Sequence, residues 1–184
     1  MKPAPGFKQW PDPVDGMWKI ELLRWLGKET GIQVLFETGT CEGVTPFNLY
    51  KDFQGIYTIE LMPSLYEIAK RRLAHTNVRM YLGSSRFMLE DILNKDVPKE
   101  PVLFWLDAHS SGPHTADDGD PLHDELEVVM RLRPDALIVV DDRKDAEFED
   151  TLDFTGWQKE YRTGEVIIHK SGMYNIPPFE EVNV

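Results

Sequence analysis

Short runs of continuous apolar residues alternate along the chain with longer segments in which apolar residues recur every three or four positions. The runs predict five β-strands, at residues 33–37, 56–60, 78–82, 102–107 and 136–141. Continuous apolar runs are typical of parallel strands that are covered on both faces. Segments 63–75, 85–95 and 122–132 have the apolar stripe of amphipathic helices. The pattern therefore predicts a parallel α/β sheet with right-handed crossovers.

The two ends of the chain depart from this alternation. Residues 1–13 are rich in proline and predict an irregular arm, which a helix over 15–28 follows. Near the other end, segments 157–162 and 165–170 are joined by a short turn containing glycine. This arrangement predicts a β-hairpin that follows the parallel strands.

Composition limits the class of protein and of partner. The chain has 184 residues and a formal net charge of −12, which argues against nucleic acid or an anionic membrane as its main partner. No apolar run approaches a membrane span, and no secretory leader is recognisable. The single cysteine, Cys41, excludes an internal disulfide and suits a reducing cytoplasm. We expect a cytoplasmic protein with one domain over residues 31–184, preceded by an arm and helix over 1–30 that is a candidate substrate cap.

Carboxylates follow four of the five predicted strands. Glu37, Glu60, Asp107 and the pair Asp141-Asp142 all lie where a strand ends. Ligands of open α/β sheets bind beyond the carboxyl ends of the strands. We therefore expect these acids to converge on one ligand-binding edge.

A glycine turn follows the first strand, with the spacing Glu37-x-Gly39-x-x-x-Gly43. This differs from the G-x-G-x-x-G spacing of dinucleotide-binding folds, which disfavours an NAD-dependent dehydrogenase. Glu60 lies 23 residues after Glu37, close to the offset at which a second-strand acid binds ribose hydroxyls. The combination favours an adenosine-containing ligand. The alternative is that the glycines serve only a tight turn and Glu60 is a solvated strand end.

These motifs resemble the class I S-adenosylmethionine-dependent methyltransferases, whose first motif is acid-x-Gly-x-x-x-Gly and whose second strand ends in an acid. Segments 104–112, 121–127 and 139–143 further resemble the bacterial macrocin O-methyltransferase-related group. The resemblance extends over about residues 33–170. It implies a Rossmann-like fold with a mostly parallel seven-stranded sheet, a C-terminal β-hairpin and helices on both faces.

The resemblance also implies roles for individual residues. Glu37 would lie near the methionine amino group, Glu60 would hold the ribose hydroxyls, and Leu61 would lie against the adenine. Ser84 replaces an acid that the family usually has at the adenine edge. The full set of implied cofactor-binding residues is Glu37, Gly39, Thr40, Gly43, Glu60, Leu61, Gly83, Ser84, Ser85 and Asp107.

A second group of candidate residues follows the fourth and fifth strands. Asp107, Asp141 and Asp142 would repel one another unless a cation bound between them. Oxygen ligands favour Mg²⁺, and metal-dependent O-methyltransferases of the catechol type hold Mg²⁺ at similar strand ends. The alternative is that Asp141 and Asp142 cap a helix and that Asp107 contacts only the cofactor.

Two residues, one at the end of the fourth predicted strand and one just beyond it, are candidates for catalysis. His109 could remove a proton from an acceptor hydroxyl, and Asp107 lies on the same loop. The loop over 110–120 is rich in glycine and acids, and is either an active-site lid or a solvated acidic loop.

The sequence thus favours a methyltransferase that uses S-adenosylmethionine, releases S-adenosylhomocysteine and methylates a hydroxyl of a small molecule, with or without Mg²⁺. One rival is a metal-dependent hydrolase or transferase built on Asp107, Asp141 and Asp142. Another is a catalytically inactive binding subunit with the same fold. Whether the protein forms a homo-oligomer is left open.

Overall fold

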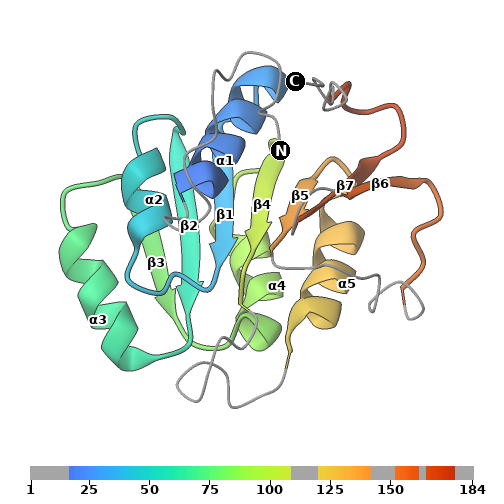
Figure 1. Cartoon of the computed structure of the whole chain (residues 1–184). Helices are drawn as coiled ribbons and strands as arrows, with labels where there is room; N and C mark the ends of the chain where they lie inside the picture. Colours follow the sequence, from blue (N-terminus) through green and yellow to red (C-terminus); the bar gives the residue numbers. More distant parts are fainter. Residues whose placement is uncertain (1–16, 109–119, 142–151, 162–164, 177–184) are drawn as a thin grey trace.

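The computed structural model describes residues 17–108, 120–141, 152–161 and 165–176, which form one seven-stranded sheet with helices on both faces (Figure 1). The strands are β1 (Val34–Thr38), β2 (Gly55–Glu60), β3 (Val78–Leu82), β4 (Val102–Leu106), β5 (Leu137–Val140), β6 (Trp157–Tyr161) and β7 (Val166–Lys170). The helices are α1 (Met17–Thr30), α2 (Val44–Leu49), α3 (Pro63–Arg72), α4 (Ser85–Lys95) and α5 (Leu122–Leu132). All five parallel strands lie within two residues of the ranges that the apolar runs predict.

The strand order is β3-β2-β1-β4-β5-β7-β6, and the first five of these strands are parallel. β7 pairs antiparallel with both β5 and β6, so the predicted C-terminal hairpin is confirmed. The chain turns to one side of β1 to form β2 and β3, and to the other side to form β4 and β5. The switch point between β1 and β4 is where an open α/β sheet binds its ligand.

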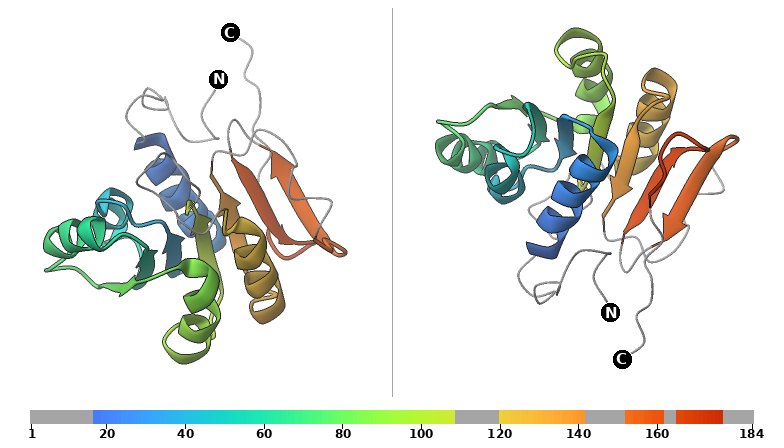
Figure 2. Two further views of the ribbon diagram at one scale, coloured as in Figure 1. Left: turned by 90° about the horizontal axis from the view of Figure 1, so that it is seen from below. Right: turned by 90° about the horizontal axis from the view of Figure 1, so that it is seen from above.

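Each face of the sheet has its own apolar core. On one face, α1 and α2 pack over alternate strand residues such as Leu35, Leu103 and Val139. On the other face, α4 and α5 pack over the intervening residues, among them Phe36 and Phe104. Figure 2 shows α1 on one side of the sheet and α4 and α5 on the other. Burial on both faces is the physical reason why the central strands β4 and β5 are apolar at every position rather than at every second one.

α1 is part of the domain core, because Leu22, Leu23 and Leu26 are buried against the sheet. Gly27 lies inside this helix, where a Cβ atom would come within 2.8 Å of the Phe53 ring. The helix ends before Gly31, whose φ of +73° is a left-handed conformation suited to glycine. The proposed capping role of segment 1–30 stays a prediction, since residues 1–16 lie outside the described ranges. Within those ranges, no helix is both long enough and apolar enough to span a membrane.

Candidate active site

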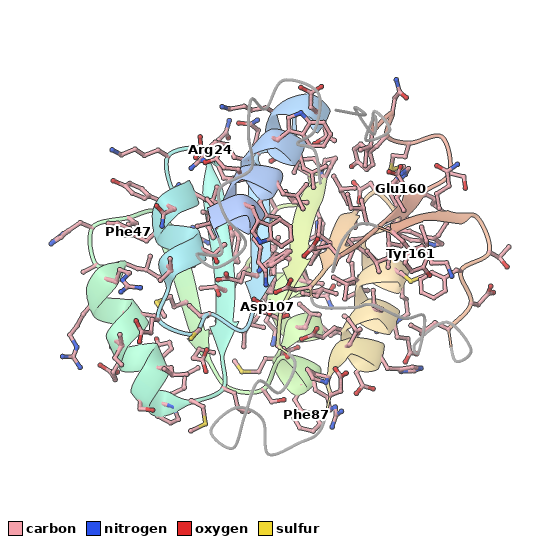
Figure 3. All side chains as sticks on the ribbon, viewed as in Figure 1. Arg24, Phe47, Phe87, Asp107, Glu160 and Tyr161 are labelled. Carbon is pink, nitrogen blue, oxygen red and sulfur yellow. The ribbon has the colours of Figure 1, made fainter. Side chains whose placement is uncertain are left out.

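Four of the predicted acids lie on the same face of the sheet, at its carboxyl edge. Trp105 of β4 pairs with Val139 of β5, and both side chains pack on the α1 side. Side chains alternate along a strand, so Asp107 and Asp141, two residues further on, extend from the same side. Glu37 and Glu60 share that side through the same alternation, since Leu35 and Ile56 pack there. Figure 3 shows Asp107 at this edge, where β4 ends.

The glycine turn after β1 is held between β2 and β4. The N–H groups of Gly39 and Thr40 both donate to the Ile59 carbonyl, at 3.0 and 3.2 Å. Gly39 has a φ of +82°, and a Cβ atom there would lie 2.4 Å from the Asp107 carbonyl oxygen. Position 39 therefore requires glycine for two reasons: its backbone conformation and its close contact with the Asp107 backbone just after β4.

Gly43 has a different reason for being glycine. It precedes α2 with a φ of +76°, and a Cβ atom there would lie 3.1 Å from the Ala69 Cβ and 3.2 Å from Leu73 on the α3 side. The missing side chain thus lets α2 pack closely beside α3. A contact between Gly43 and the cofactor stays a prediction.

Glu60 ties the end of β2 to the glycine turn. Its Oε2 accepts a hydrogen bond from the Cys41 N–H at 2.7 Å, and its Oε1 accepts one from the Met62 N–H at 2.8 Å. The side chain is only 5% exposed, and burial raises its pKa despite these two bonds. A third backbone hydrogen bond, from Leu61, also reaches this carboxylate, which is therefore fixed in orientation and keeps room for a further donor.

Glu37 lies beneath the turn and is 1% exposed. Thr58 donates to its Oε2 at 2.7 Å, and the Thr58 and Thr40 hydroxyl oxygens are 2.5 Å apart. Burial is the main cause that raises the pKa of Glu37 to about 8, against the effect of hydrogen bonds from Thr58 and Thr45. The Thr40 side chain therefore faces the core, which leaves the backbone of the turn on the ligand side.

The raised pKa of Glu37 predicts an unusual dependence of stability on pH. The folded state binds this proton more tightly than the unfolded state, whose glutamate has its ordinary pKa near 4.5. The contribution of Glu37 to stability should therefore be fully present below that value and be lost, by roughly a few kcal/mol, as pH rises through about 8. Urea denaturation between pH 5 and pH 8 measures this. The Glu37→Gln variant should show a shallower fall, whereas Glu67→Gln, an exposed site on α3, should match the wild type. An equal slope in all three proteins would contradict the assignment.

The segment after β3 contains three of the implied adenine-edge residues. The Gly83 N–H donates to the Glu60 carbonyl at 2.9 Å, which places this segment beside the end of β2. The buried Ser85 hydroxyl hydrogen-bonds to Glu125 of α5, so this side chain joins two helices. Cofactor contacts of Gly83, Ser84, Ser85 and Leu61 stay predictions.

Asp107 and Asp141 lie side by side, and a lysine completes the group. Their carboxyl groups hydrogen-bond to each other, and burial together with Asp141 raises the pKa of Asp107. The Lys19 Nζ of α1 forms an ion pair with Asp141 Oδ2. It also lies 5.8 Å from the centre of the Trp105 ring. The nearby ammonium lowers the pKa of Asp107, in opposition to the larger effect of burial.

The predicted metal site is not found among the described residues. They contain no group of three His, Cys, Asp or Glu side chains arranged to hold a metal ion. Asp107 and Asp141 do come together as predicted, but the cation beside them is the Lys19 ammonium. Asp142 and His109, together with most of the predicted lid over 110–120, lie outside the described ranges. Asp107 and Asp141 alone, paired with this lysine, are too few oxygen donors for a divalent metal, and the three-residue site that includes Asp142 stays a prediction.

No protein-family model and no curated protein sequence matches this chain. Solved structures do match it. The O-methyltransferase of Bacillus cereus in complex with SAH is 17% identical with a TM-score of 0.65, over 86% of this chain and 80% of that one. A putative caffeoyl-CoA O-methyltransferase of Staphylococcus aureus is 16% identical with a TM-score of 0.63, over 88% and 85%. TomG of Streptomyces achromogenes, an O-methyltransferase of tomaymycin synthesis in complex with SAM, is 21% identical with a TM-score of 0.58, over 84% and 80%.

The chain has a Rossmann-like methyltransferase fold. The predicted fold class is thereby confirmed. At these identities the likeness establishes the fold, and the chemistry has to be argued from the residues.

In this methyltransferase fold, Glu125 is a residue that the sequence analysis missed. It is 1% exposed in the first turn of α5, and burial is the main cause that raises its pKa to about 7, against hydrogen bonds from Ser85 and Thr38. It lines a small hollow at the ends of β4 and β5, together with Ala108, Asp120 and Asp141. A signal was present, because Glu125 lies at helical spacing between the buried Leu122 and Val129, on the apolar face of the helix.

Proposed function

We propose that this protein is an S-adenosylmethionine-dependent methyltransferase that methylates a hydroxyl oxygen of a small molecule. The observation that carries the proposal is the hydrogen bond from the Cys41 N–H to Glu60. It joins the glycine turn and the second-strand acid into one unit at the switch point of the sheet. A turn and an acid that served only their own strands would have no reason to be joined in this way.

The charge of the edge suits the cofactor. S-adenosylmethionine is a sulfonium cation, and when bound it supplies an electrophilic methyl group. The acceptor oxygen forms the new C–O bond as the C–S bond breaks, and the electron pair of that bond stays on sulfur. Glu37, Glu60 and Asp107 lie around the Gly39 turn, and burial raises the pKa of each of them. A sulfonium bound there would favour the ionised form of these carboxyl groups, which would then attract the cation.

The chain's own contribution would be mainly positioning. Glu60 would hold the ribose, and the backbone of the Gly39 turn would support the methionine end. The acceptor's hydroxyl proton has to leave for a base at the same edge. Asp107 is the candidate for this base within the described ranges, and His109 is the candidate outside them.

An oxygen acceptor is supported by the fold relatives, since the Bacillus cereus and TomG proteins are both O-methyltransferases. A small molecule is favoured over nucleic acid because the net charge of −12 repels a phosphate backbone. Assignment to the macrocin-related group rests on the sequence motifs alone and stays part of this proposal.

Calorimetric titration tests the cofactor assignment. We expect S-adenosylmethionine and S-adenosylhomocysteine each to bind one site per chain in the micromolar range, and NAD⁺ to give no heat at the same concentrations. The absence of heat with both adenosyl ligands would exclude the proposed function.

A metal-dependent hydrolase or transferase is the rival that the structure makes less favourable, because Lys19 already pairs with Asp141. An inactive binding subunit would bind the adenosyl ligands equally well. Transfer of a radioactive methyl group from S-adenosylmethionine to a panel of hydroxylated compounds distinguishes an enzyme from such a subunit.

A further inference from the structure

Lys19 lies in an unusual place for a lysine. It is the third residue of α1, and a cation in the first turn of a helix is disfavoured by the helix dipole. Its Nζ nevertheless points toward the sheet, where it pairs with Asp141 across 122 positions of sequence. Local helix preference therefore does not explain the position of this ammonium, whereas the carboxylates at the ends of β4 and β5 do.

The surroundings of Lys19 hold the ammonium from several sides. Its Nζ lies 5.8 Å from the centre of the Trp105 ring, which is fully buried, and 5.9 Å from the centre of the Trp18 ring. Both distances allow a cation–π attraction. Asp141 is 1% exposed and Lys19 is 24% exposed, so the ion pair is shielded from water on the carboxylate side. A buried carboxylate of this kind needs a cation partner, and the fold supplies one from its own chain.

A divalent ion bound by both carboxyl groups would have to break the hydrogen bond between Asp107 and Asp141, and it would compete with the ammonium for the Asp141 carboxylate. Mg²⁺ requires near-octahedral oxygen ligands at about 2.0–2.1 Å, which the paired carboxyl groups and the ammonium do not offer as they stand. We propose that Lys19 is the resident cation of this site and takes the place of a divalent metal. Given the proposed methyltransferase function, the acceptor is then positioned without a metal ion.

Lys19 is a positioning residue in this proposal. It holds Asp141, and the Asp141 carboxyl group hydrogen-bonds to Asp107. The backbone carbonyl oxygen of Asp107 lies against Gly39 of the glycine turn. Through Asp141, the lysine therefore holds the Asp107 carboxyl group in place beside the Gly39 turn.

Binding of Mn²⁺, followed by the electron paramagnetic resonance signal of the free ion, tests this without any adenosyl ligand or acceptor. Four proteins are compared with the wild type: Lys19→Met, Lys19→Arg, Lys28→Met and the double variant Lys19→Met/Asp141→Asn. Lys28 is an exposed lysine at the other end of α1 and is the matched control. The comparison cancels weak binding to acidic surface residues, which all five proteins share.

We expect Lys19→Met to gain one Mn²⁺ site that is at least tenfold tighter than any site of the wild type, and the double variant to lose it. Lys19→Arg and Lys28→Met should behave like the wild type. Addition of Mn²⁺ should raise the melting temperature of Lys19→Met and leave that of the wild type unchanged.

Two results would overturn the proposal. One is tight binding of one Mn²⁺ by the wild type that is lost in the Asp141→Asn variant. This result can be obtained even if the Lys19 variants do not fold. The other is a folded Lys19→Met variant that gains no site. Calorimetry with S-adenosylhomocysteine on the same samples keeps the questions separate, because absence of that binding in the wild type would contradict the proposed function and leave the role of Lys19 in metal exclusion to the Mn²⁺ data.

Discussion

The Gly39→Ala variant is expected to lose at least a hundredfold in affinity for S-adenosylhomocysteine and to be less stable by about 2–5 kcal/mol. Alanine is disfavoured at the φ of +82°, and its Cβ would lie 2.4 Å from the Asp107 carbonyl oxygen. That oxygen belongs to the backbone of the residue that directly follows β4 and cannot rotate away as a side chain could. The turn and the end of β4 would have to separate, and both are parts of the proposed cofactor site.

Gly31→Ala is the matched control for this variant. Gly31 has a similar φ of +73°, but a Cβ atom there would meet nothing within 4 Å. The Gly31→Ala substitution should therefore lower the free energy of unfolding only by the conformational contribution, about 1 kcal/mol, and leave ligand affinity unchanged. Urea denaturation and calorimetry measure the two effects. Equal losses of stability in the two variants would show that the contact between Gly39 and Asp107 is unimportant.

Glu60→Ala is expected to weaken the binding of S-adenosylhomocysteine by a hundredfold or more while the protein stays folded. The substitution removes the acceptor for the Cys41 and Met62 N–H groups as well as the proposed partner of the ribose. The Cys41 and Met62 bonds are present with and without ligand, so the loss of affinity comes from the proposed bonds of the ribose hydroxyls. Hydrogen bonds to a charged group contribute roughly 1.5–3 kcal/mol each, and two of them give an effect of this size. Calorimetric titration at one pH and salt concentration measures it.

Two further variants separate the contributions of Glu60. Glu60→Gln keeps one carbonyl acceptor and should bind more tightly than Glu60→Ala but more weakly than the wild type. Glu67→Ala removes an exposed acid from neighbouring α3 and should bind like the wild type. If Glu60→Ala retained full affinity, the proposed ribose contact would be excluded, and the acid would serve only to hold the turn.

Much of the fold followed from periodicity. β4 is apolar at every position and β1 over its first three residues, because neighbouring residues such as Leu35 and Phe36 pack on opposite faces under different helices. The sequence placed Asp107 and Asp141 inside strands, whereas the ladder ends one residue earlier, at Leu106 and Val140. This boundary is set by where pairing between strands stops, which a single strand's composition does not reveal.

The acidic edge of the sheet was likewise predictable from the sequence only in part. The sequence by itself determined that carboxylates lie at the carboxyl ends of β1, β2, β4 and β5, and the parallel order of these strands brings the acids to one edge. It also contained the spacing that places Glu60 near the glycine turn.

Only the tertiary structure decided which cation these acids meet. Lys19 reaches Asp141 because α1 packs across the sheet with its first turn at the carboxyl edge, a contact that links positions 122 residues apart. No rule of local spacing relates them, since the pairing depends on how a helix and a sheet pack in three dimensions. The acids that meet at this edge thus required a cation, and the packing of α1 on the sheet supplied the Lys19 ammonium.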